Sequence, residues 1–419
     1  MITRPAILFL AHRIPYPPNK GDKIRTFNQV RFFSQFFDID LVALVDAPDD
    51  MERLAEYREK LETCCRSVHL FRLETRTAKL RGIWSIARGG SISQGYFFLK
   101  AAAGRVCDLM TEEAYKAVFC FSSPTAEYVL RCIDKMPPGK ARPRLIMDFC
   151  DVDSEKWRQY AETCAFPMNL VYRIEARRLN RFEAKVHNRF DASVFVSDQE
   201  ANLFRSRVSA YGDIIVVTNG VDHRYFSPDH SESAAEDSDK PLVLMFPGAM
   251  DYHANADAVT WFCESVLPQL ADVGRRIRFD IVGKNPIPSV SALADMKIHS
   301  NIQVQVTGFV EDIRPYYSAA DIVVVPLRIA RGIQNKVLEA MAMARPVIAS
   351  PSAADGIGAE DGRHLITAQT SQEFAQHIAA WGRDKDASHK IGRTARQFVE
   401  ERFSWDACLK DLVPMIHRK

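Results

Sequence analysis

Residues 321–346 read DIVVVPLRIARGIQNKVLEAMAMARP and combine three structural signals. The β-branched run at 322–325 predicts a buried strand, which Pro326 ends. A polar loop follows, and Gly332 is expected to open an amphipathic helix that precedes a second apolar run at 346–349. Strand, helix and strand in this order predict a βαβ unit of a parallel sheet.

The same alternation extends along nearly the whole chain, on both sides of a polar, acidic segment at 227–240. Strands are expected at 6–11, 40–45, 68–73, 117–121, 144–148, 192–196 and 214–218, then at 242–246, 278–282, 302–306, 322–325, 346–349 and 364–366. We therefore predict two doubly wound α/β domains that face each other across a cleft. The predicted parts are domain 1–226, linker 227–240, domain 241–402, and a C-terminal helix at 403–419 that returns to the first domain.

The amino-acid composition argues against several classes of protein. The 419 residues include 55 Lys+Arg and 53 Asp+Glu, and 47% are hydrophobic, which argues against a disordered chain and against a nucleic-acid partner. Nine scattered cysteines without a CxxC pair favour reduced thiols and argue against a zinc knuckle. Neither a signal peptide nor a membrane-spanning helix is expected, so we predict a cytoplasmic protein, soluble or peripheral at the inner face of the membrane.

The loop after the first expected strand, residues 12–25, contains three prolines and four cations before a helix expected near Ile24. A helix N-terminus beside cations is suited to bind an anion or a hydroxyl group. A Pro-rich connector with solvated charges fits the same residues, and no GxGxxG fingerprint is present. The residues assigned to acceptor binding here are Gly21, Asp22, Lys23 and Arg25.

The expected helix after Gly332 offers a second site. Gly332, Asn335, Lys336 and Glu339 share one face by their spacing of three and four residues. A diphosphate at the helix start could be neutralised by Lys336, while Glu339 accepts hydrogen bonds from a vicinal diol. The structural alternative is an ion pair between Lys336 and Glu339 on an exposed face.

Three stretches carry a further signal: the run 321–346, TNGVD at 218–222 and VTGFV at 306–310. Together they resemble the retaining glycosyltransferases of family 4. Four further stretches are similar to the subgroup linked to exosortase/PEP-CTERM exopolysaccharide clusters: HRIPYPPNKGDKIRTFN at 12–28, DFCDVDSEKW at 148–157, GAMDYHAN at 248–255 and RGIQNKVLE at 331–339. The resemblance covers nearly the full chain and implies the GT-B fold of two Rossmann-like domains.

The resemblance also implies a nucleotide-sugar donor, a co-substrate rather than a cofactor, held mainly by the C-terminal domain. The loop from Gly248 to Asn255 would approach the diphosphate, and the backbone at Phe309 and Val310 would meet the nucleobase. Glu339 matches the second glutamate of the family's E-x7-E motif and would bind the ribose hydroxyls. The residues that would contact the diphosphate and sugar are Gly332, Ile333, Gln334 and Lys336.

One position departs from the family pattern. Arg331 stands where the first glutamate of the E-x7-E motif is usual. A guanidinium can only donate hydrogen bonds and prefers anions. Either Arg331 binds phosphate or a sugar carboxylate, or the sugar is recognised elsewhere.

Catalytic candidates come from both domains: Asp151, Asp153, His12 and Lys336, with Lys156 as a further acceptor-binding residue. Asp151 and Asp153 have the spacing of a DxD metal site, but the surrounding strand pattern is wrong for that architecture, and we predict no metal. Helix capping is the structural alternative for Asp153 and Ser154. The resemblance implies retaining transfer by front-side attack, with the leaving diphosphate stabilised by Lys336, helix N–H groups and Arg331 or Lys23.

A basic stretch at 66–105 holds eight cations and one carboxylate, interleaved with aromatic residues. This mixture suits an anionic membrane surface, and a solvated basic face fits equally well. The predicted function is transfer of a hexosyl group to a saccharide or lipid-linked saccharide acceptor in exopolysaccharide biosynthesis. The alternatives are a nucleotide-sugar 2-epimerase and a catalytically silent binding protein of the same fold.

Overall fold

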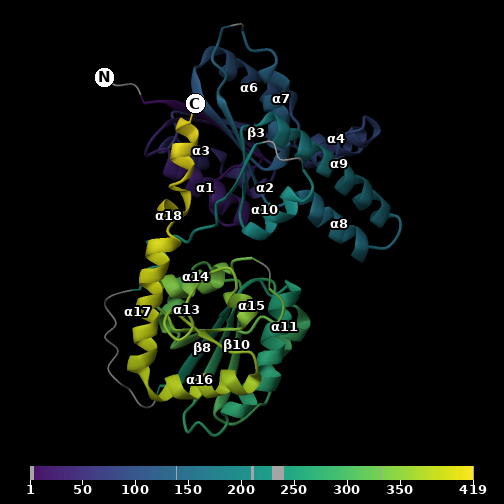
Figure 1. The fold of residues 1–419 in the computed structure, drawn as a ribbon. Coiled ribbons are helices and arrows are strands. Elements are labelled where there is room, and N and C mark those ends of the chain that lie inside the picture. The colour runs from purple at the N-terminus through teal and green to yellow at the C-terminus, as the bar shows by residue number, and fades with distance from the viewer. Residues whose placement is uncertain (1–3, 138, 209–211, 229–239, 331, 419) are drawn as a thin grey trace. The chain divides into compact units, whose positions relative to one another are not determined.

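The computed structural model describes residues 4–137, 139–208, 212–228, 240–330 and 332–418. The chain divides into two compact units: unit 1 is Met1–Asn219 with Cys408–Lys419, and unit 2 is Gly220–Ala407. Each unit is built on one parallel β-sheet flanked by helices (Figure 1). The predicted fold class of two doubly wound α/β domains is therefore confirmed. Most of the linker predicted at 227–240 lies outside the described residues, and the division falls before residue 220.

Unit 1 has a seven-stranded sheet in the order β3-β2-β1-β4-β5-β6-β7, parallel throughout. Its strands are β1 (Ala6–Ala11), β2 (Asp38–Val45), β3 (Ser67–Arg72), β4 (Tyr115–Phe121), β5 (Arg144–Cys150), β6 (Ala192–Phe195) and β7 (Asp213–Val216). Its helices are α1 (Gly21–Phe33), α2 (Pro48–Glu52), α3 (Leu54–Glu62), α4 (Thr75–Ala87), α5 (Ile92–Phe97), α6 (Lys100–Glu112), α7 (Ala126–Ile133), α8 (Asp153–Thr163), α9 (Met168–Arg189), α10 (Asp198–Arg205) and α19 (Leu412–His417), with a 3-10 turn η1 (Ser123–Thr125). The strand order reverses between β1 and β4, the point where such sheets bind ligands.

The two faces of this sheet are buried against different helices, because successive side chains of a strand point to opposite faces. Leu8 and Leu10 of β1 belong to a core cluster with residues of α6, α7 and α9. Phe9, between them, stacks on Phe119 with ring centroids 5.2 Å apart. Phe33 of α1 packs against Phe119 at 5.1 Å. Both faces being apolar explains why the strands read as continuous hydrophobic runs.

Unit 2 has a six-stranded parallel sheet in the order β10-β9-β8-β11-β12-β13. Its strands are β8 (Leu242–Pro247), β9 (Ile277–Val282), β10 (Ile302–Gly308), β11 (Ile322–Val325), β12 (Val347–Ala349) and β13 (Ile366–Thr367). Its helices are α11 (His253–Trp261), α12 (Pro288–Ser291), α13 (Arg314–Ala319), α14 (Asn335–Ala342), α15 (Pro351–Ala354), α16 (Ser371–Arg383) and α17 (Lys385–Arg402), with short helical turns η2 (Phe262–Val266), η3 (Leu267–Leu270) and η4 (Ala292–Asp295). All thirteen predicted strands are present in the two sheets.

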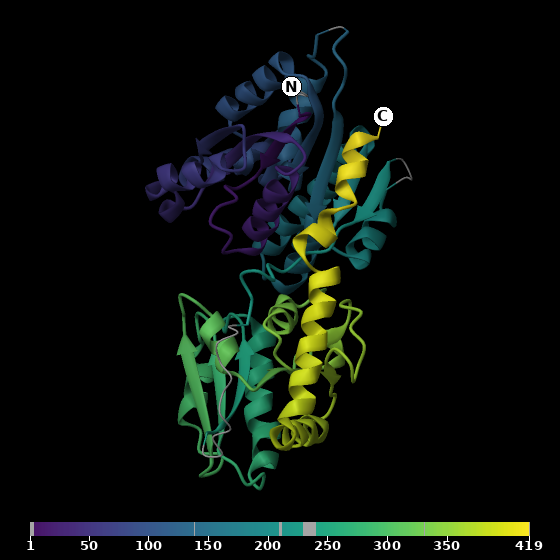
Figure 2. The same cartoon turned by 90° about the vertical axis from the view of Figure 1, so that its left-hand side faces the viewer.

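Residues near the C-terminal end of the sequence complete unit 1. Helix α18 (Trp405–Leu409) contains the boundary between the units, and α19 contacts β4 (Figure 2). The ring of His417 lies 5.3 Å from that of Phe37, and the Thr218 hydroxyl donates to Cys408 Sγ at 3.6 Å.

Three local expectations are wrong. Helix α1 begins at Gly21 rather than near Ile24, and α14 begins at Asn335 rather than at Gly332. Cys107 of α6 and Cys132 of α7 form a disulfide, so reduced thiols were wrongly expected for this pair. Within the described ranges, no helix is long and apolar enough to cross a membrane.

Candidate functional site

Lys336, in the first turn of α14, is the centre of a polar cluster in unit 2. Its Nζ donates to Asn255 Oδ1 at 2.6 Å and lies 4.3 Å from the ring centroid of Phe246. Asn255, buried on α11, in turn donates to the carbonyl of Ala249 at 2.9 Å. The ammonium group is thus oriented by one acceptor and one aromatic face, which leaves donor capacity for an anionic ligand.

Two glycines allow this cluster to form. A Cβ atom on Gly248 would lie 2.7 Å from Asn255 Nδ2 and 3.1 Å from Lys336 Nζ, so a side chain there would displace both. Gly283, which follows β9, has φ +154°, and a Cβ atom on it would lie 1.7 Å from the carbonyl oxygen of Gly248. The loop after β9 can therefore approach the carbonyl of Gly248 only because residue 283 is glycine, and the glycine at 248 leaves room for Asn255 and Lys336.

Glu339 lies one turn after Lys336 and accepts a hydrogen bond from the hydroxyl of Tyr317 at 3.0 Å. Burial raises the pKa of Glu339, although Tyr317 and Lys336 act in the opposite direction. Burial lowers the pKa of Lys336 to about 7, against the attraction of Glu339. Each side chain is held by a separate partner rather than in the alternative ion pair. Tyr317 was not predicted, because a tyrosine on α13 carries no local signal of this contact.

The other predicted donor residues lie in loops around the same sheet. Gly332 has φ +63° and precedes α14, and its carbonyl accepts from Gln334 Nε2 at 3.1 Å. Ile333 and Val310 pack against the core, whereas Phe309 is 73% exposed. Arg331 lies outside the described residues. Their roles toward a donor stay predictions.

In unit 1, His12 follows β1 and belongs to a charged cluster. Its Nε2 lies 3.4 Å from Asp22 Oδ2, and Arg13 bridges Asp22 and Asp46 at 3.1 and 2.9 Å. Burial lowers the pKa of His12, an effect that Asp22 opposes only in part. Burial would raise the pKa of Asp22, but His12 and Arg13 lower it on balance. A neutral imidazole fits the role of a proton acceptor.

Two predicted acceptor residues are buried in ion pairs. Lys23 donates to Asp50 at 2.7 Å, and Arg25 donates through Nε to Asp148 Oδ2 at 2.9 Å. Arg25 also donates to Asn219 Oδ1 at 2.9 Å and is only 1% exposed. These contacts join α1 to β5 and to the chain after β7, an arrangement that favours a structural role. Gly21 and Asp22 open α1, and Gly21 has open space around it.

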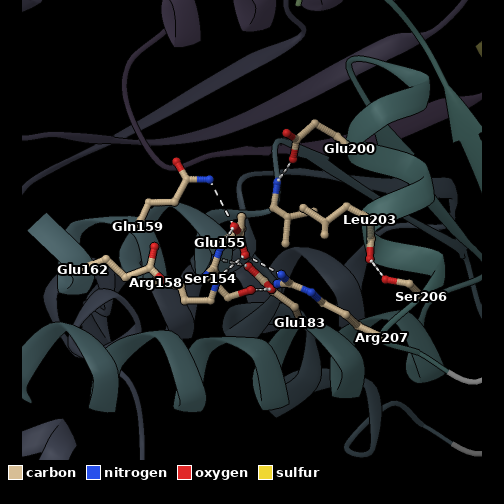
Figure 3. A network of polar contacts seen from close by, with 11 residues as sticks. Ser154, Glu155, Arg158, Gln159, Glu162, Glu183, Glu200, Leu203, Ser206 and Arg207 are labelled. Atoms are coloured by element: carbon tan, nitrogen blue, oxygen red, sulfur yellow. Dashed lines mark hydrogen bonds and ion pairs between the residues drawn. The ribbon is translucent and has the colours of Figure 1, made fainter. Parts of the chain in front are cut away.

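The loop after β5 is held by carboxylates that the sequence did not single out. Glu200 of α10 accepts from the backbone N–H of Val152 at 2.7 Å. Glu183 of α9, almost fully buried, accepts from the N–H and the hydroxyl of Ser154 at 3.0 and 2.5 Å (Figure 3). Cys150, the last residue of β5, has φ +64°, a strained conformation for a residue with a side chain. Three hydrogen bonds and a strained backbone therefore fix this loop.

The side chains of Asp151 and Lys156 are exposed, and Asp153 is half-buried. Burial raises the pKa of Asp153 to about 6, with Lys156 opposing and Asp151 adding to the rise. The structural alternative, helix capping by Asp153 or Ser154, is not observed, because Val152 is the N-cap of α8 and its side chain makes no capping hydrogen bond. The chemical roles of these aspartates stay predictions.

Comparisons with known proteins agree with this architecture. Residues 241–384, inside unit 2, match the family model described as Glycosyl transferases group 1. HepE from Anabaena, solved in complex with UDP, has a TM-score of 0.65 at 16% identity, covering 98% of this chain and 99% of its own. The chain has the GT-B fold. A glycosyltransferase from Rickettsia africae (TM-score 0.64, 15% identity, 99% and 98% covered) and sucrose-phosphate synthase from Thermosynechococcus elongatus (0.62, 16%, 98% and 98%) share it.

At the level of sequence, the chain is similar to an uncharacterized 44.6 kDa protein in the cps region of Klebsiella pneumoniae. The two are 23% identical over 163 residues, which is 38% of this chain and 42% of the relative. This chain thus spans less than half the length of that relative. The family match thus concerns residues 241–384 of unit 2, and the solved structures show the fold.

Proposed function

We propose that the protein is a glycosyltransferase that binds a nucleotide-sugar donor through unit 2. The observation that carries this proposal is the pair on α14, Lys336 and Glu339, each held by a separate partner. A cation beside the loop after β8 suits a diphosphate, and a carboxylate one turn later suits ribose hydroxyls. The match of residues 241–384 to group 1 glycosyltransferases covers this pair.

The donor that we propose first is a UDP-sugar. HepE, which shares the fold, was solved with UDP. Gly248 and Asn255 would border the diphosphate, Gly332 to Gln334 the sugar, and the backbone at 309–310 the base. Arg331 would contact phosphate or a sugar carboxylate.

We propose retaining, metal-independent transfer of a hexosyl group to a saccharide, with the acceptor lipid-linked and the product an exopolysaccharide. Lys336 would stabilise the negative charge that develops on the leaving diphosphate, a contribution of about 10²–10³ in turnover for one preorganised group. On the acceptor side, His12 or one of the aspartates Asp151 and Asp153 would orient the attacking hydroxyl. These steps rest on the family resemblance and on the burial of His12 and Asp153.

The test is slow release of free UDP from a panel of UDP-sugars without acceptor, followed by transfer to saccharide acceptors. A transferase releases nucleotide, and Lys336→Ala should abolish the release. A 2-epimerase would instead give an epimerised sugar, and a silent binding protein would bind UDP-sugar without turnover. Lys390→Ala on α17, an exposed lysine that is not part of the cluster, serves as the matched control. No binding of any nucleotide sugar would contradict the proposal.

A further inference from the structure

A basic cavity of about 560 Å³ lies in unit 1, bordered by α4, α5, α7 and α9, and no residue predicted from the sequence as a site residue lines it. Six cations around it face one carboxylate, that of Glu127. The cations are Arg81, Arg88, Arg131, Arg178, Arg181 and Lys185. Half of them come from α9, far along the chain from the basic stretch at 66–105.

Only part of this charge is compensated within the protein. Arg131 pairs with Glu127 at 2.7 Å, and Arg178 donates to backbone carbonyls, including that of Gly90 at 2.9 Å. Among the described residues, the side chains of Arg88, Arg181 and Lys185 have no hydrogen-bond or ion-pair partner, and Arg81 Nε is buried without one. Cations gathered around one cavity repel each other, and a bound anion would remove that repulsion.

The chemistry of the lining favours a phosphoryl group. Guanidinium groups donate two parallel hydrogen bonds to phosphate oxygens, and lysine adds a point charge. Several cations converging on one space suit a group of more than one negative charge, such as a diphosphate.

An apolar surface adjoins the cavity. Leu80, Ile83 and Trp84 of α4 are 59%, 63% and 66% exposed, and their spacing of three and four residues puts them on one face of the helix. Trp84 also lines the cavity. A ligand with an anionic head and an apolar tail would match both surfaces.

The cavity is also close to the His12 cluster. Phe97 lies edge-on to His12 with ring centroids 5.3 Å apart, and the next residue, Phe98, lines the cavity beneath Arg131 at 4.2 Å. Glu175 of α9 is fully buried and accepts a hydrogen bond from the N–H of Ser93 at 2.9 Å. This contact fixes α5 between the cavity and the His12 cluster.

We propose that this cavity binds the phosphate or diphosphate of an acceptor whose apolar part lies along Leu80, Ile83 and Trp84. The assignment to an acceptor rests on the proposed function, whereas affinity for a phosphoryl group does not. The phosphoryl group can come from a lipid-linked or a soluble ligand.

The first experiment titrates inorganic diphosphate into the full chain carrying Lys336→Ala, so that the donor site does not contribute, and follows heat and tryptophan fluorescence. Adding Arg181→Ala with Lys185→Ala should weaken binding at least about a hundredfold, since each of the two lost charge-assisted hydrogen bonds is worth about tenfold or more in affinity. Arg177→Ala, an exposed arginine of α9 outside the cavity, should leave binding unchanged. Equal binding in all variants, or none in the parent, overturns the proposal.

The second experiment separates the two sources by flotation with phosphatidylcholine vesicles that contain a polyprenyl diphosphate. A lipid-linked ligand predicts that Ile83→Ser with Trp84→Ser reduces flotation but not affinity for inorganic diphosphate, while a soluble ligand predicts no flotation. If the Arg181→Ala, Lys185→Ala variant floats with phosphatidylglycerol vesicles as much as the parent protein does, these two cations do not bind the lipid phosphate. That result overturns the site. Slow UDP release by the Arg181→Ala, Lys185→Ala variant with Lys336 left intact tests the proposed function separately, because this release depends on unit 2.

Discussion

Lys336 and Glu339 lie three residues apart on one helix, yet each is held by a different partner and not by the other. Lys336 is oriented by Asn255 and Phe246, and Glu339 by Tyr317. Burial shifts both pKa values toward neutral forms. Shifted pKa values cluster at functional sites, where burial and charged neighbours tune the groups that contact a ligand.

We predict that Glu339→Gln weakens binding of UDP about tenfold or more without unfolding the protein. The amide keeps the shape of the carboxylate and can still accept from Tyr317, but it loses charge-assisted hydrogen bonds to ribose hydroxyls. Calorimetry with UDP and a thermal melt measure both effects. Glu401→Gln, an exposed glutamate on α17, is the matched control. Unaltered UDP affinity in Glu339→Gln would remove the ribose assignment.

The pKa of Lys336, lowered to about 7, makes UDP binding pH-dependent. Above this pH the free protein has lost the proton, and the bound diphosphate favours the charged form, so binding takes up a proton. We expect affinity to fall by up to about tenfold per pH unit above the pKa. Calorimetry in buffers of different ionisation enthalpy detects the proton uptake. In Lys336→Arg the side chain stays charged, so UDP affinity should no longer fall with rising pH. The same fall in affinity in that variant would refute the prediction.

At the scale of elements, the sequence predicted the strands well and the helix starts less well. Buried parallel strands are continuous apolar runs, as at Ile322–Val325, and this signal is local. Helix starts depend on which backbone conformation the preceding loop adopts: Gln334 is extended and serves as the N-cap of α14, so Gly332 stays in the loop.

The candidate site was predictable only where its residues stand in motifs. Lys336 and Glu339 stand out by spacing, but Tyr317 reaches Glu339 from α13 in unit 2. In unit 1, Glu183 reaches the loop after β5 from α9. Such partners are fixed by tertiary packing, which a single sequence does not display. The same holds for Arg25, whose cationic side chain suggested an acceptor contact but is buried against Asp148.

Glu183 links α9 to the start of α8, and its pKa is raised from 4.5 to about 8 by burial, against the hydrogen bonds from Ser154. The folded state therefore binds this proton more tightly than the unfolded state. The contribution of this protonated carboxyl to the free energy of unfolding is fully present below about pH 4.5 and is lost as the pH rises to about 8.

We predict that Glu183→Gln, which cannot ionise, becomes progressively more stable relative to the parent protein across this range, by up to about 1.4 kcal/mol per pH unit. Urea unfolding at a series of pH values measures the difference. Glu162→Gln, exposed on α8, should show no such trend. A stability difference that does not vary with pH would contradict the buried, protonated carboxyl.

For the whole molecule, the two units have separate cores, and unit 1 is discontinuous in sequence. Ile416 of α19 is fully buried in unit 1. We predict that Ile416→Ala destabilises unit 1 by about 3 kcal/mol, the usual cost of such a cavity, and leaves unit 2 unchanged. Hydrogen exchange resolved along the chain measures each unit separately. Arg418→Ala, at an exposed position, is the control; equal loss of protection in both units would show that they unfold as one.

The placement of α19 against β4 has a consequence for biosynthesis. Nearly all of unit 1 leaves the ribosome first, but its last helix follows only after residues 220–407 have been made. At elongation rates of about 5–20 residues per second, this interval is on the order of ten seconds or more. Throughout that time the surface that α19 will cover is open to chaperones, so the first unit to be synthesised is the last to be completed.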